Sequence, residues 1–74
     1  MKAKELKKAG VVPAWANYLT KNKAGSITAH VERPVLRLGF FGSNWVSTGM
    51  SERIPGVSVD EFDGKDWNLC VYAF

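Results

Sequence analysis

Two residues of this chain have the types that nucleophilic catalysis needs: the thiol of Cys70 and the imidazole of His30. A thiolate becomes a useful nucleophile when a neighbouring base or positive charge lowers its pKa, and a third group usually orients the base. Cys70 lies in the apolar stretch 67–74, where a thiol is expected to be buried and inert, and His30 lies on the polar side of an alternating stretch. No third group accompanies them, and one cysteine and one histidine are too few for structural zinc. We therefore predict no catalytic residue and no enzymatic activity.

The acidic stretch 60–66 is the candidate for a metal site. A calcium-binding EF-hand loop needs carboxylates at its first, third and fifth positions, glycine at the sixth and glutamate at the twelfth. Placing Gly64 at the sixth position puts Val59 at the first and Cys70 at the twelfth, and neither offers a carboxylate. The segment 39–42 has no phosphate-loop pattern. We expect a solvated turn at 60–66, with no metal and no cofactor.

Charge is spread unevenly along the 74 residues. Residues 1–40 have a net charge of +6, whereas residues 41–74 have a net charge of −3. A small domain with two oppositely charged ends presents a surface suited to association rather than to chemistry. The single cysteine excludes an intrachain disulfide, which favours a reducing compartment.

Nucleic acid is one partner that this charge could attract, because the pI is near 9.3. Aromatic side chains next to Arg33 and Arg37 could stack on bases; they are Trp15, Tyr18, Phe40, Phe41 and Trp45. However, so small a chain needs most of its aromatic residues for its own core, and the acidic second half would repel a polyanion. Nucleic-acid binding is therefore kept as an alternative.

The first half of the chain predicts a helix followed by a hairpin. Residues 2–9 are good helix formers that stop at Gly10. Residues 13–19 fit either a second helix or a strand, and the turn signal at 22–25 favours extended structure for their second half. Residues 26–33 alternate between apolar and polar side chains, which is the pattern of a half-buried strand.

The second half predicts further extended segments at 35–41 and 44–48 and an irregular stretch at 49–66. Residues 67–74 are rich in aromatic and β-branched side chains, so we predict a strand that is apolar on both faces and lies inside a sheet. The predicted fold class is α+β: one domain, residues 1–74, with a short N-terminal helix packed on a small antiparallel sheet of three to five strands.

The N-terminus has charged residues but no apolar signal core, and no apolar run is long enough to span a bilayer. These features predict a soluble, cytoplasmic protein that does not bind membranes.

The residues expected to contact a partner are Phe40 and Phe41, an apolar pair at a predicted loop, together with Lys21 and Lys23. Apolar side chains of the irregular stretch could extend this pair into an exposed patch for a partner or for self-association; they are Met50, Ile54 and Val57. Alternatively, these side chains fold back and cap the sheet.

Turns and aromatic residues follow one pattern over about three quarters of the chain, in Pro13-Ala-Trp-Ala-Asn-Tyr-Leu19, the turn 22–25, the strand 27–34, Trp45 and Asp66-Trp-Asn-Leu69. This pattern resembles small uncharacterised proteins of tailed bacteriophages and prophages. The turn here is Lys-Ala-Gly where those proteins have an Asp-Gly type. The resemblance implies a phage accessory protein, made in the host cytoplasm, that binds and inhibits or redirects a host macromolecule of defence, transcription or replication. It supplies no site residues. A basic nucleic-acid-binding protein and a self-associating structural protein, which would form homo-oligomers, are the alternatives.

Overall fold

Strong helix formers and alternating strands give this chain a small α+β fold. The computed structural model describes residues 1–40 and 42–74. The helix α1 (Ala3–Lys8) ends in two lysines that suit the negative end of its dipole. Six strands follow: β1 (Tyr18–Lys21), β2 (Ile27–His30), β3 (Val35–Gly39), β4 (Gly42–Val46), β5 (Ser51–Ile54) and β6 (Val71–Ala73). Short 3-10 helices lie at Asp60–Phe62 and Trp67–Leu69.

The main sheet has four antiparallel strands in the order β5-β2-β1-β6. The turn predicted at 22–25 joins β1 to β2 and places Leu19 opposite Ala29 and Thr20 opposite Thr28. Because side chains alternate along a strand, Leu19 and Ala29 share the inner face and the two threonines share the outer face. This confirms a short helix on a small antiparallel sheet.

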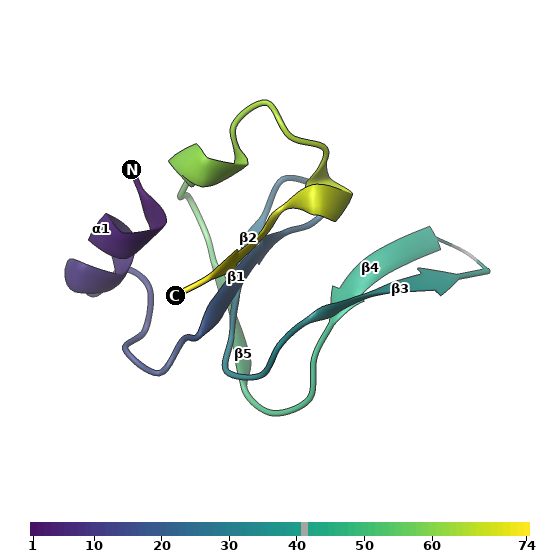
Figure 1. The fold of residues 1–74 in the computed structure, drawn as a ribbon, viewed down its shortest axis with the longest axis horizontal. Coiled ribbons are helices and arrows are strands. Elements are labelled where there is room, and N and C mark those ends of the chain that lie inside the picture. The colour runs from purple at the N-terminus through teal and green to yellow at the C-terminus, as the bar shows by residue number, and fades with distance from the viewer. Residues whose placement is uncertain (41) are drawn as a thin grey trace.

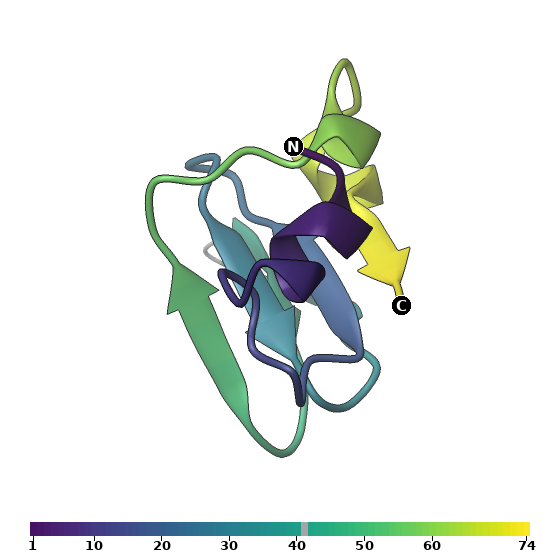
Figure 2. The ribbon, with the colours of Figure 1, turned by 90° about the vertical axis from the view of Figure 1, so that its left-hand side faces the viewer.

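The core lies between the inner face of this sheet and the helix. Figure 2 shows α1 in front of the sheet. Leu6 from α1 is buried together with Leu19, Ile27 and Phe62. The outer face carries polar side chains instead, including Thr20 and His30. The polar face predicted for β2 therefore exists, but His30 is only 3% exposed because another part of the chain covers it.

That covering part is the hairpin of β3 and β4, which lies between β2 and β5 in the sequence and forms a separate two-stranded sheet. In Figure 1 the hairpin lies to the right of the main sheet and α1 lies to the left. The molecule thus has three layers: helix, four-stranded sheet and projecting hairpin.

Three predictions about strands were wrong or incomplete. Residues 67–69 form a 3-10 turn instead of a strand, because the amides of Leu69 and Cys70 bond back to Asp66 and Trp67. The strand that follows, β6, lies at the edge of the sheet and not inside it. β5 falls in the stretch predicted to be irregular, since its Glu52-Arg53 pair hides the strand pattern.

The segment 13–19 begins with a turn and is extended at its end, where β1 starts at Tyr18. The amide of Ala16 bonds to the carbonyl of Pro13 in a single turn, and β1 then begins at Tyr18. No second helix forms there, because the chain makes only a single turn at Pro13–Ala16. Ala16 and Leu19 are both buried in the core. Among the described residues, no helix is long and apolar enough to cross a membrane.

Candidate binding surfaces: the hairpin and a polar cavity

The β3–β4 hairpin is the first candidate surface. Its register places Leu36 opposite Trp45 and Arg37 opposite Asn44, so the two pairs lie on opposite faces of the ribbon. The indole Nε1 of Trp45 donates to the carbonyl oxygens of Lys21, at 3.1 Å, and Trp67, at 3.3 Å. One side chain thus attaches the hairpin to the end of β1 and to the turn before β6.

Several large apolar side chains are exposed along β3 and in the turn that follows it. Val35 is 58% exposed, Leu38 78% and Phe40, which follows β3, 96%. Phe41, also predicted to contact a partner, lies outside the described residues. The patch proposed from the sequence is only partly exposed, since Met50 is exposed but Ile54 is buried in the core.

Two arginines lie beside these apolar residues. An open groove of about 460 Å³ is lined by Arg33, Val35 and Arg37 and by the end of β4 and the residues after it. The guanidinium carbon of Arg33 lies 6.0 Å from the centre of the Tyr18 ring, within the range of a cation–π contact. The groove therefore joins two fixed positive charges to an aliphatic wall.

Lys21 and Lys23 lie elsewhere. Lys21 ends β1 opposite Ile27, on the inner face of the sheet, and lines a small pocket with Asp63. Lys23 is exposed in the β1–β2 turn. Phe40 lies in the turn between Gly39 and Gly42, which are paired at the end of the hairpin, so the two lysines and the phenylalanine belong to different parts of the surface.

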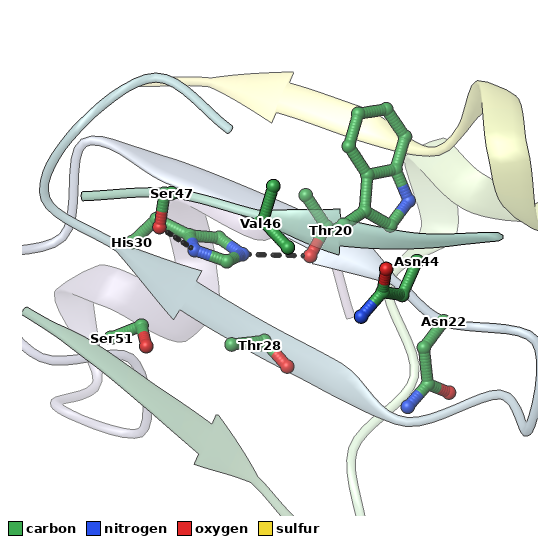
Figure 3. A pocket seen from close by; sticks show the side chains of 9 residues that line it. Thr20, Asn22, Thr28, His30, Asn44, Val46, Ser47 and Ser51 are labelled. Carbon is green, nitrogen blue, oxygen red and sulfur yellow. Dashed lines mark hydrogen bonds between the residues drawn. The ribbon is translucent and has the colours of Figure 1, made fainter. Parts of the chain in front are cut away.

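The second candidate site is a cavity of about 340 Å³ between the outer face of the sheet and β4. His30 lies at its wall (Figure 3). The Nε2 atom of His30 is 2.9 Å from the hydroxyl of Thr20, and Nδ1 is 2.7 Å from the hydroxyl of Ser47. A hydroxyl can donate or accept, so these two neighbours satisfy either neutral tautomer of the ring. Burial lowers the pKa of His30, which keeps the imidazole uncharged at neutral pH.

The cavity was not predicted. Sequence reasoning treated the polar side of β2 as a solvated face, and nothing in the spacing reveals that Ser47 returns to cover His30. The available signal was the row of hydroxyl residues on the outer faces of β1 and β2, Thr20 and Thr28, next to a histidine.

The structure places Cys70 away from this cavity. Its Sγ lies 3.3 Å from the carbonyl oxygen of Asp66 and 3.8 Å from those of Phe62 and Lys65. Burial raises the pKa of the Cys70 thiol, with Lys21 and Lys65 opposing the shift. The thiol and His30 thus have separate sets of partners.

The acidic stretch has structural partners. Asp60 pairs with the N-terminal ammonium group at 3.1 Å, and Glu61 accepts the amide of Ala3 at 2.9 Å, which holds the start of α1 against the 3-10 helix. Over residues 1–40 and 42–74, no three acidic, histidine or cysteine side chains come together in a way that could hold a metal ion.

Comparison with known proteins finds no match to this chain among protein-family models, curated proteins or solved structures.

Proposed function

We propose that this chain is a non-enzymatic binding protein that engages a protein surface through its β3–β4 hairpin. The observation that carries the proposal is the exposure of Leu38 and Phe40 at the far end of a hairpin that projects from the main sheet. Large apolar side chains grouped on a soluble domain mark interaction sites, and aromatic residues are frequent anchors in protein interfaces.

The charge of the hairpin describes the partner. Residues 33–46 include Arg33 and Arg37 and no acidic residue. A complementary surface has an apolar pocket for the tip, bordered by carboxylates that can pair with the arginines.

A protein partner is favoured over nucleic acid by the arrangement of the basic residues. The lysines of α1 lie on one side of the main sheet and the hairpin arginines lie beyond its other side (Figures 1 and 2). Lys7 is also engaged within the fold, since its Nζ donates to the carbonyl of Ala16 at 2.7 Å and lies 4.6 Å from the centre of the Phe74 ring. The basic residues thus do not form one track for a phosphate backbone.

The resemblance to phage proteins supports the biological part of the proposal. In this view the chain is phage-encoded, acts in the host cytoplasm, and inhibits or redirects a host component of defence, transcription or replication by occupying its surface.

The test is affinity capture from a bacterial host lysate with the wild-type chain and a double variant, Leu38→Ser with Phe40→Ser. The matched control is Met50→Ser, which removes an apolar side chain that is 55% exposed outside the hairpin. All three proteins should have the same melting temperature, because the replaced side chains lie at the surface. We expect one protein to be retained by the wild type and the control but not by the double variant.

Two further results would point to the alternatives. Retention that disappears after nuclease treatment and falls steeply with added salt would replace the proposal with nucleic-acid binding. A concentration-dependent oligomer in light scattering that the double variant abolishes would make the hairpin a self-association element.

A further inference from the structure

The cavity under β4 contains polar groups that the fold itself does not use. Thr20 and Ser47 hold His30, and the Oδ1 of Asn22 accepts the amide of Ser26 at 2.9 Å. In contrast, the half-buried side chain of Thr28 and the exposed side chains of Ser51 and Asn44 line the open cavity without a hydrogen bond to any other described residue.

These unused groups come from both walls of the cavity. Thr28 belongs to β2 and Ser51 to β5, on the outer face of the main sheet, whereas Asn44 belongs to β4 of the hairpin. Figure 3 shows the Asn44 amide turned from the hairpin towards β2. A molecule in this space could therefore bond to the sheet and to the hairpin at once.

The lining also has a definite chemistry. The described residues that line the cavity include no lysine, arginine, aspartate or glutamate, and burial lowers the pKa of the His30 imidazole, so the ring is uncharged at neutral pH. Arg53 lies on the same outer face of the sheet, opposite Thr28, but is not among the lining residues. The lining itself thus supplies neither the fixed positive charge that an anion needs nor the carboxylate that a cation needs. Hydroxyl and amide groups both donate and accept, and so match a ligand whose own groups do the same. Trp45 and Val46 add apolar surface.

We propose that this cavity binds a neutral, polyhydroxylated ligand of the size of one sugar unit, held between Thr28, Ser51 and Asn44. The volume of about 340 Å³ lies at the lower end of the range for ligand pockets, about 300–1,000 Å³. A sugar offers several hydroxyls to the polar groups and C–H surfaces to the apolar wall. This site is separate from the hairpin tip, so its test does not depend on the proposed function.

The test is to titrate the isotope-labelled full chain with glucose, galactose or mannose and to measure the amide chemical shifts by NMR at each sugar concentration. With so few hydrogen bonds available, we expect a Kd of about 1 mM, so the sugar concentration is raised to about ten times that value. We expect saturable shifts at Thr28, Asn44 and Ser51 for at least one sugar, and slower amide exchange in β4 when that sugar is bound. The methyl glycoside of the sugar that binds then distinguishes two sources: equal binding indicates a sugar unit of a larger molecule, and loss of binding indicates a free sugar.

Matched variants tie the signal to the cavity. Thr28→Val and Asn44→Ala should each weaken binding about fivefold to tenfold, the effect of one lost hydrogen bond. Ser43→Ala should leave it unchanged, because Ser43 is the neighbour of Asn44 on the opposite face of β4. Comparison of free-state NMR spectra establishes that each variant is folded before its binding is measured.

Three outcomes would overturn the proposal. The first is the absence of a saturable shift with any of the three sugars. The second is a shift that Thr28→Val and Asn44→Ala leave unchanged. The third is tighter binding at the same residues of uridine, a neutral nucleoside, or of glucose 6-phosphate, an anion, than of the neutral sugars.

Discussion

The imidazole Nδ1 of His30 and the hydroxyl of Ser47 lie 2.7 Å apart, although the two residues are 17 positions apart in the chain. Between them the chain leaves the main sheet, forms the whole β3–β4 hairpin and returns. This contact and the Trp45 bonds are therefore the points at which the hairpin is fastened to the sheet's outer face.

The buried His30 makes stability depend on pH. Its pKa in the folded protein is lowered from its ordinary value of 6.5 by burial, so the unfolded chain takes up a proton more readily than the folded one. The neutral His30 makes its full contribution to the free energy of unfolding above about pH 6.5. This contribution is lost as the pH falls through that value towards the pKa of His30 in the folded protein. The free energy of unfolding in urea should therefore fall from pH 8 to pH 5, by at most about 1.4 kcal/mol per pH unit from this group.

His30→Gln provides the comparison for that measurement. The glutamine amide retains hydrogen-bonding capacity but does not titrate, so the difference between the two proteins isolates the effect of the His30 imidazole. We expect the stability advantage of the wild type to shrink between pH 7 and pH 5. Parallel curves for the two proteins over this range would contradict the assignment.

Trp45→Phe should loosen the hairpin. The change keeps an aromatic ring but removes the N–H that bonds to Lys21 and Trp67. The free energy of unfolding in urea should fall by about 0.5–1.5 kcal/mol. Relative to the wild type, hydrogen exchange should become faster at the β4 amides, with a smaller change at the β1 amides. Trp15→Phe is the control, since Trp15 packs against the core cluster beneath the main sheet. The same exchange pattern in both variants would show that the Trp45 bonds do not hold the hairpin.

Gly49→Ala should destabilise the protein more than Gly10→Ala. Both glycines have a positive φ, +76° at Gly49 and +78° at Gly10, which costs an L-residue about 1–2 kcal/mol. Only at Gly49 would the added Cβ also approach other side chains, at 3.0 Å from Val31 Cγ1 and 3.2 Å from Glu32 Cγ. The midpoints of urea denaturation give the comparison, and equal midpoints would mean that these neighbours move away without cost.

Cys70 should react slowly with thiol reagents while the protein is folded. Its side chain is fully buried, and burial raises the pKa of its thiol, which reduces the thiolate fraction. Alkylation by iodoacetamide at pH 8 should be slower than in the same chain unfolded in urea, since the folded protein both covers the sulfur and reduces its thiolate fraction. A rate equal to that in urea would show an accessible thiol.

The elements predicted well are those whose signal is local. The helix at residues 3–8 follows from helix propensity and the stop at Gly10, and the β1–β2 hairpin follows from alternation around a turn. The strand predicted at 67–74 is present only at Val71–Ala73, because apolar alternation looks the same whether Trp67–Leu69 extends or closes a turn. Hydrogen bonds back to Asp66 and Trp67 decide between the two.

The sites depend on contacts between distant residues, which alternation does not encode. The surroundings of His30 required knowing that β3 and β4 leave the main sheet and bring Ser47 back over it. The apolar pair at residues 40 and 41 was visible in the sequence, and the structure places Phe40 at the exposed tip.

The position of β1 between β2 and β6 has a consequence for how the chain is made. β1 and β2 are joined by a short turn and can pair as soon as residue 30 leaves the ribosome, but the other edge of β1 waits for residues 71–73. Until then the nascent hairpin exposes an unpaired strand edge, the kind of surface on which chains associate wrongly. A chain that lacks residues 71–73 would leave that edge of β1 permanently open.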